Sequence, residues 1–130
     1  MRWSLPVRLF IKRFRDAGRG LWLLYLDPSF RLDLKLGGVA VVAGLVFQIT
    51  ATQWALLVIV IGVVLKAEAF NTVQELQADF KQKPAAPPWL HYDPDIRDIK
   101  DISAGGVLIV SISAAIVGTI IFVPYINHVL

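Results

Sequence analysis

The sequence predicts an all-α integral membrane protein with three transmembrane helices and an amphipathic surface helix at its N-terminus. Three observations lead there. Of the 130 residues, 56% are hydrophobic, more than an ordinary soluble domain carries. The apolar residues gather in long runs without charge, at residues 36–65 and 102–123. Basic residues collect at the N-terminus and before the last run. The chain has no cysteine, which excludes disulfides and thiolate chemistry.

Residues 1–30 are expected to lie on the membrane surface. Their basic side chains are Arg2, Arg8, Lys12, Arg13, Arg15 and Arg19. Apolar side chains alternate with these at helical spacing, among them Trp3, Leu9 and Phe14. A cationic helix with one apolar face binds an anionic leaflet. This interpretation is favoured over a tail that binds nucleic acid.

The first long run is best explained as two spans. As one helix, residues 36–65 would measure about 45 Å, against about 30 Å for the hydrocarbon core of a bilayer. Polar residues interrupt the middle of the run, so we expect helices over residues 32–51 and 53–83, with a turn near Ala51–Gln53. Arg31 and Lys35 would snorkel to the interface. One steeply tilted span is the alternative.

The third span is predicted within a helix over residues 98–123, ending at Pro124. The span is rich in small side chains, which let membrane helices pack closely against partners. The stretch "KPAAPPWLHYDPD" before it has four prolines and is expected to be a loop. Within it, Trp89 and Tyr92 suit the membrane interface.

The distribution of lysine and arginine gives the orientation. The N-terminus and the loop between spans two and three are basic, whereas the turn near Ala51 and the C-terminal tail carry no Lys or Arg. Cytoplasmic segments carry the excess of basic residues. The N-terminus is therefore expected in the cytoplasm and the C-terminus outside.

A polar stripe begins where the second span ends. Glu68, Asn71, Glu75 and Asp79 fall within an arc of about 80° on one helix face. Carboxylates on one face repel each other unless a cation meets them, and Mg²⁺ brought with nucleotide phosphates would suit such oxygen-rich groups. The plain alternative is a solvated face on a helix that protrudes into the cytoplasm. The position of Glu68 near the lipid boundary speaks against that alternative, because ionisable residues there are costly and usually functional.

A second group of candidates stands at the start of the third span. Lys100 and Asp101 would lie at the depth of the stripe if the second and third spans form a hairpin. A lysine there could bind phosphate oxygens. Snorkelling of Lys100, with Asp101 capping the helix, explains the pair equally well.

The chain resembles the small prokaryotic diacylglycerol kinase and undecaprenol kinase family. The resemblance rests on "EAFNTVQELQAD", followed at matching spacing by "KDISAGGVL", and it covers roughly residues 10 to 124. It implies a homotrimeric bundle of three-span subunits in the bacterial inner membrane. It also implies transfer of the γ-phosphate of ATP, with Mg²⁺, to a membrane alcohol, and no nucleic-acid partner.

The resemblance also assigns roles by position. Glu68 matches the general base, Glu75 and Asp27 match metal-binding carboxylates, and the nucleotide side is matched by Asn71, Asp79, Lys100 and Asp101. The family normally has Glu where this chain has Asp27, which is one methylene shorter and precedes Pro28.

The expected function is therefore ATP-dependent phosphorylation of a lipid alcohol at the cytoplasmic face. Undecaprenol and diacylglycerol are both open as acceptors, with undecaprenol preferred. The alternative, suggested by Asp27, is a non-catalytic membrane scaffold or an inactive relative of the lipid kinases. A transporter is disfavoured because the second and third spans are nearly all apolar away from their cytoplasmic end.

Overall fold

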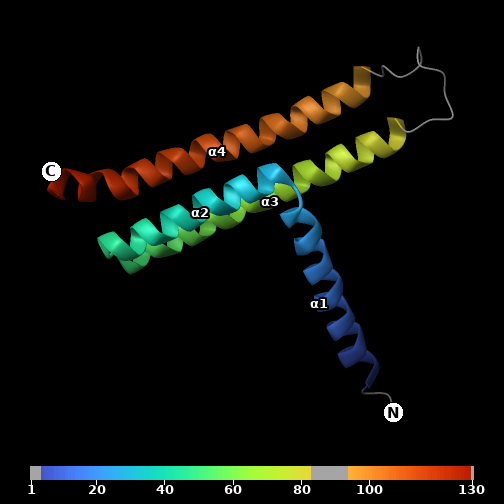
Figure 1. The fold of residues 1–130 in the computed structure, drawn as a ribbon, viewed down its shortest axis with the longest axis horizontal. Coiled ribbons are helices and arrows are strands. Elements are labelled where there is room, and N and C mark those ends of the chain that lie inside the picture. The colour runs from blue at the N-terminus through green and yellow to red at the C-terminus, as the bar shows by residue number, and fades with distance from the viewer. Residues whose placement is uncertain (1–3, 83–93, 130) are drawn as a thin grey trace.

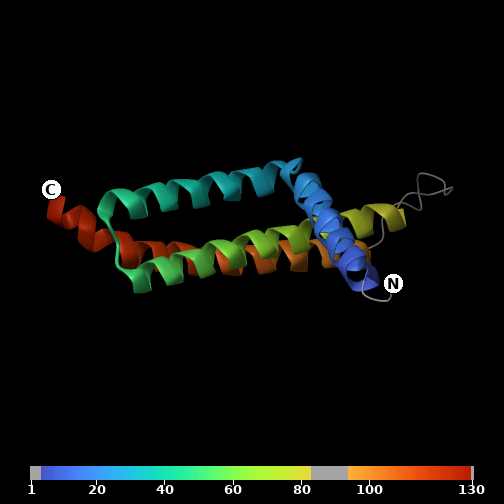
Figure 2. The same cartoon turned by 90° about the horizontal axis from the view of Figure 1, so that it is seen from below.

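A computed structural model describes residues 4–82 and 94–129, and these residues form four α-helices and no strand. The helices are α1 (Ser4–Tyr25), α2 (Pro28–Phe47), α3 (Ala51–Gln82) and α4 (Pro94–Val129). Helices α2, α3 and α4 form a bundle in which α3 runs antiparallel to the other two, while α1 leaves the bundle at a steep angle (Figures 1 and 2). The all-α prediction is confirmed. Most of the predicted loop, with Trp89 and Tyr92, falls outside the described residues, but its last two residues, Pro94 and Asp95, begin α4 and are not loop.

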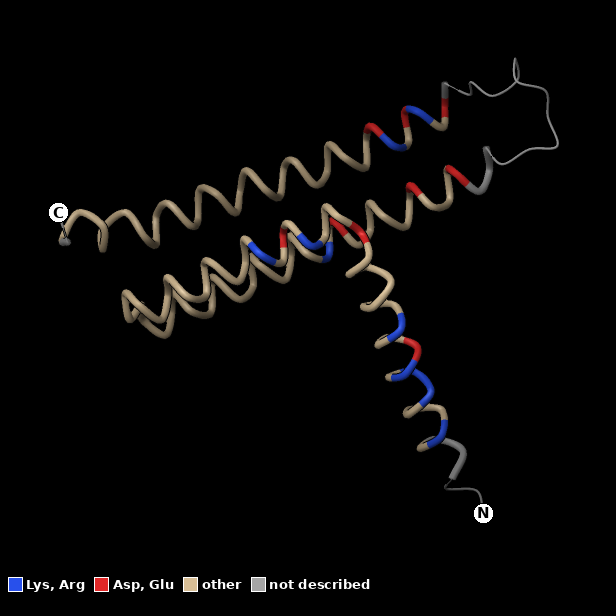
Figure 3. The backbone as a smooth tube through the Cα atoms, viewed as in Figure 1, with Lys and Arg blue, Asp and Glu red and all other residues tan. Residues whose placement is uncertain are grey.

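The charged residues of the bundle lie at one end of it. The Lys, Arg, Asp and Glu residues of the bundle lie in the first part of α2 and of α4 and in the second part of α3, from Lys66 onward, and the opposite end has none among the described residues (Figure 3). We call these the charged end and the distal end. The distal end holds the turn between α2 and α3 and the C-terminal part of α4.

The break between α1 and α2 follows from an Asp-Pro pair. Asp27 is the N-cap of α2, with φ −74° and ψ 127°, and Pro28 occupies the first helical turn. A residue before proline is pushed out of the helical region, and proline is favoured at the first position of a helix. The chain therefore ends α1 before Asp27 and starts α2 in a new direction.

The turn between α2 and α3 lies at Gln48–Thr50, earlier than the predicted Ala51–Gln53, which instead begin α3. Two hydrogen bonds fix this start. The Thr50 amide donates to Gln53 Oε1 at 2.9 Å, and the Gln53 amide donates to Thr50 Oγ1 at 3.3 Å. This reciprocal pair is a capping box, a signal for the N-terminus of a helix. Gln48 completes the reversal in the left-handed region, with φ 51°.

Helix α4 continues through Pro124 to Val129, so the prediction that it ends before this proline was wrong. Proline removes one backbone donor, which membrane helices tolerate where neighbouring groups compensate. Here the residue after the proline, Tyr125, is bound by side chains of the other two helices of the bundle. Tyr125 donates its hydroxyl to Gln53 Oε1 at 2.7 Å, and its ring stacks on Phe47 with centroids 5.9 Å apart.

The buried apolar core is small and lies toward the distal end. Its centre is Ile49, Leu57 and Ile121, with Trp54 and Phe122 packed against it. Most large apolar side chains point away from the bundle and are exposed in the single chain. Such flanks suit lipid or further protein chains, not water.

Two of the helices, α3 and α4, are long and apolar enough to cross a membrane, over Ala51–Asp79 and Asp95–His128. Helix α2 is not counted with them because three charged residues, Arg31, Asp33 and Lys35, lie near its start and leave too short a stretch of low charge. Beyond Lys35 it is free of charge to its end. The third span therefore remains a prediction.

Candidate functional site

The polar stripe runs along one continuous helix, α3, and passes from buried to exposed. Glu68 and Asn71 are only 5% and 8% exposed, whereas Glu75 and Asp79 are exposed at the charged end. An isolated buried carboxylate is expensive, so its retention points to a use. The two inner residues face the neighbouring helices and not the surroundings, which disfavours a merely solvated face.

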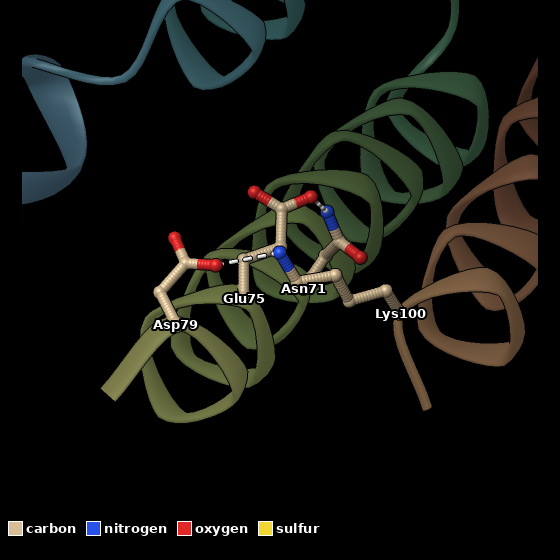
Figure 4. Close-up of polar contacts among 4 residues, drawn as sticks. All are labelled: Asn71, Glu75, Asp79 and Lys100. Carbon is tan, nitrogen blue, oxygen red and sulfur yellow. Dashed lines mark hydrogen bonds and ion pairs between the residues drawn. The ribbon is translucent and has the colours of Figure 1, made fainter. Parts of the chain in front are cut away.

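Asn71 links the buried and exposed parts of the stripe. Its Nδ2 donates to Glu75 Oε1 at 3.0 Å (Figure 4). Its Oδ1 is buried and has no hydrogen-bond partner in the described part of the chain. A buried, unpaired acceptor costs free energy, commonly about 1–3 kcal/mol. Asn71 is therefore ready to accept a hydrogen bond from a group that the protein itself does not supply.

Asp27 reaches the stripe from the junction of α1 and α2. Its Oδ2 lies 3.5 Å from Thr72 Oγ1, at the long limit for a hydrogen bond, and the same hydroxyl donates to the Glu68 carbonyl at 3.1 Å. Its Oδ1 caps α2 by accepting from the amides of Ser29 and Phe30 at 2.8 and 3.2 Å. Only Oδ2 is thus left for a further ligand.

Negative charge is concentrated around Glu68. The carboxylates of Asp33, Asp27 and Glu75 all lie near enough to act on its charge. Asp33, in α2, was not among the sequence candidates. In the sequence it stands between Arg31 and Lys35, in a stretch that suggests only residues at the membrane interface. Its nearness to Glu68 is seen only once α2 is packed beside α3. The cluster favours a cationic or proton-donating partner.

Lys100 joins α4 to the outer end of the stripe. Its Nζ lies 2.6 Å from Asp79 Oδ1 (Figure 4). Both side chains are partly solvent-exposed, and exposed pairs of this kind are weak. Lys100 can therefore exchange Asp79 for a phosphate oxygen at little cost. Asp101, predicted beside it, instead pairs with Arg97 one turn earlier on α4, with Nε and Oδ2 3.5 Å apart.

The residues fit a metal that arrives with its own ligands better than one held by protein alone. Among the described residues, no group of three or more acidic or histidine side chains is placed to hold a metal ion. Among the described residues, Glu75 keeps one carboxylate oxygen without a protein partner, and Asp27 Oδ2 makes only the long contact with Thr72. Mg²⁺ often takes one or two carboxylates and fills its remaining positions with water and substrate phosphates. A Mg²⁺–nucleotide complex matches that donor set.

Comparison with known proteins also points to proteins that use nucleotides, namely kinases. A family described as prokaryotic diacylglycerol kinase matches residues 15–122. A protein of Bacillus subtilis (strain 168) named undecaprenol kinase is 26% identical over 116 residues, which cover 88% of this chain and 89% of that protein. No solved structure matches.

Proposed function

This chain belongs to the prokaryotic diacylglycerol kinase family, and from that premise we propose that it transfers the γ-phosphate of ATP to a membrane lipid alcohol at the cytoplasmic face. The match covers most of the chain and includes every candidate residue. The alternative of a non-catalytic scaffold gains no support from the family or from the named relative.

The observation that carries the proposal is the place of Glu68. It is a buried carboxylate at the point where the apolar part of α3 gives way to the stripe. A lipid alcohol keeps its chain in the bilayer and can present its hydroxyl only near that boundary. Glu68 would accept the hydroxyl proton while the alcohol oxygen bonds to the γ-phosphorus, and the bond from that phosphorus to the β–γ bridging oxygen breaks to release ADP.

The exposed end of the stripe would receive the nucleotide. Lys100 would move from Asp79 to phosphate oxygens, and the unpaired Oδ1 of Asn71 would accept a hydrogen bond from the bound nucleotide or its water. Asp101 would assist from α4. Asp27 and Glu75 would hold Mg²⁺, which, when bound, neutralises charge on the transferring phosphate.

Undecaprenol is the proposed acceptor, with diacylglycerol as the competing one. The relative from Bacillus subtilis bears the name undecaprenol kinase. The proposal includes a bacterial inner-membrane location, three spans and a homotrimer. The exposed apolar flanks of the bundle support further chains around it.

The direct test is phosphorylation of each lipid in turn. The purified protein in lipid nanodiscs receives labelled ATP, Mg²⁺ and either undecaprenol or diacylglycerol, and the labelled lipid is counted. We expect turnover with undecaprenol, lowered about 10²–10⁴-fold by Glu68→Gln, the range for loss of a general base. Asp98→Asn, an exposed acid of α4 outside the stripe, is the matched control and should keep full activity. Full turnover in Glu68→Gln would remove Glu68 from the role of base, and absence of turnover with both lipids would contradict the proposed activity.

A further inference from the structure

A cavity of about 260 Å³ lies between α2, α3 and α4. Its walls are almost wholly apolar, and small residues such as Gly37, Ala40 and Gly118 make the space. Two side chains of the lining are polar, Asp33 and Ser111. Phe122 lines the cavity toward the distal end.

The two polar side chains stand at the level of Glu68. Lys100 of α4 contacts Asp79 of α3, and the two helices are antiparallel. Ser111 and Glu68 each lie eleven residues from that contact toward the distal end, so they share one level. Asp33 lies near enough to act on the charge of Glu68. The polar end of the cavity thus lies at the level of the proposed base, one turn beyond Val64 of its lining.

Ser111 has a hydroxyl to offer. Two other hydroxyls of α4 are bound to their own helix: Ser113 donates to the Ile109 carbonyl at 2.9 Å, and Thr119 to the Ala115 carbonyl at 2.8 Å. Such bonds within a helix are the usual solution for Ser and Thr. Ser111 makes none within the described residues, although it lines the cavity. Ser103 Oγ is buried and has no partner among the described residues, but Ser103 does not line the cavity.

The volume suits one hydrocarbon chain. An apolar cavity of about 150 Å³ is enough to bind one benzene ring, and this cavity is less than twice as large. Ser111 and Phe122 are eleven residues apart on α4, so the lined length is on the order of 16 Å. A space this long and this small suits part of a single chain better than two chains side by side.

We propose that this cavity binds the single hydrocarbon chain of the acceptor alcohol, with the hydroxyl end held by Asp33 and Ser111 next to Glu68. The proposal rests on the proposed kinase activity and narrows it to single-chain alcohols of the polyprenol type. The chain lies among Gly37, Ala40 and Gly118, and the hydroxyl donates to Asp33 or Glu68 while accepting from Ser111.

Gly118 provides a variant that closes the cavity. A Cβ at this position meets no atom within 4 Å, so a larger side chain enters the empty space without displacing backbone. Gly118→Leu is therefore expected to fill the cavity. Gly106 is the matched control, because its Cβ also meets nothing within 4 Å, it lies on the same helix, and it does not line the cavity.

The first experiment maps binding without turnover. The full chain in nanodiscs is irradiated with a diazirine-bearing C20 prenol or with a diazirine-bearing diacylglycerol, and labelled peptides are located by mass spectrometry. We expect the prenol to label Ala114 and Ala115, labelling to fall at least fivefold in Gly118→Leu, and Gly106→Leu to match the wild type. Labelling confined to the outer flanks, unchanged labelling in Gly118→Leu, or equal labelling of the cavity by diacylglycerol would overturn the proposal.

The second experiment tests the polar end by kinetics. Ser111→Ala should raise the KM for the prenol several-fold and leave the KM for ATP unchanged, and Ser113→Ala should alter neither. An unchanged prenol KM in Ser111→Ala would overturn the role of Ser111. The two proposals fail separately: a labelled cavity in a protein without turnover refutes the kinase, whereas turnover without cavity labelling refutes this binding site.

Discussion

At Asp27, one carboxylate serves two neighbours. Oδ1 caps α2 through the amides of Ser29 and Phe30, and Oδ2 faces Thr72 on α3. Aspartate is among the best N-cap residues, and a proline at the next position strengthens the same signal. An aspartate at this position, where the resemblance leads us to expect a glutamate, therefore has a structural reason in this chain. The remaining oxygen is what a metal could use.

Two substitutions separate these roles of Asp27. Asn caps a helix as well as Asp does, so Asp27→Asn should leave unfolding in detergent unchanged yet lower turnover at least tenfold, because one anionic ligand is lost. Asp27→Ala should in addition cost about 1 kcal/mol of stability. Unfolding midpoints and Mg²⁺ titrations of activity check both. Wild-type activity and Mg²⁺ dependence in Asp27→Asn would show that Asp27 is a cap and no ligand.

The spacing of residues along the sequence predicted the stripe on α3, but it did not predict which residues of α2 and α4 lie beside the stripe. Glu68, Asn71 and Glu75 lie on one helix, and the 3.6-residue period alone places them together. Asp33 and Ser111 lie on α2 and α4, and their nearness to Glu68 depends on how far each helix slides along α3. That register depends on contacts between residues far apart in the sequence, such as the hydrogen bond from Tyr125 to Gln53.

Among the elements, the distal end of the bundle shows how α4 is fastened to the α2–α3 turn. Gln53 Oε1 accepts from the Thr50 amide and from the Tyr125 hydroxyl, 72 residues away in sequence. One side chain thus caps α3 and holds α4 beyond its proline. Phe47 stacks on the Tyr125 ring and contacts Phe122 in the same aromatic cluster.

Removal of the Tyr125 hydroxyl should weaken this junction modestly. Tyr125→Phe keeps the stacked ring, and Gln53 still accepts from Thr50, so no buried acceptor is orphaned. We expect a loss of about 0.6–1.5 kcal/mol in unfolding by denaturing detergent. Tyr25→Phe is the control, since Tyr25 is exposed on α1 and stacks only on Trp22. Equal effects of the two substitutions would contradict a specific bond at Tyr125.

Two errors in the predicted elements lie at this end of the bundle, while at the charged end α2 and α4 each begin four residues earlier than predicted, at Pro28 and Pro94. The cluster of polar residues indicated roughly where the chain turns. The Thr50 hydroxyl accepts from the Gln53 amide and caps α3, so the helix begins at Ala51 and the turn lies before it. Pro124 is an ordinary stop signal in water. The tertiary contacts of Tyr125 override it here, and a sequence read one segment at a time does not contain them.

In the molecule as a whole, the apolar surface outweighs the apolar core. Among the described residues, few apolar side chains are buried in the single chain: Ile49, Leu57 and Ile121 toward the distal end, and Phe30, Ala78 and Ile96 at the charged end. Large apolar side chains such as Val46, Ile102 and Ile120 stay exposed. Packing within one chain therefore contributes only part of the stability. The rest must come from the bilayer and, in the proposed trimer, from other copies.

The number of spans can be measured with single cysteines, because the chain has none of its own. Three spans place Gly18 of α1 on the side opposite to Thr52 and His128. We expect an impermeant maleimide to label Thr52→Cys and His128→Cys in intact spheroplasts, and Gly18→Cys only after permeabilisation. If α2 stayed outside the membrane, Gly18 and Thr52 would react from the same side.

The location of the cavity also decides how the supply of acceptor is to be counted. Its walls belong to the apolar parts of three helices, so the proposed acceptor would reach it sideways out of the leaflet and not as a solute in water. Encounter is then set by lateral diffusion in two dimensions. For the proposed activity, saturation should accordingly follow the mole per cent of alcohol in the bilayer and not its molar concentration in the assay volume.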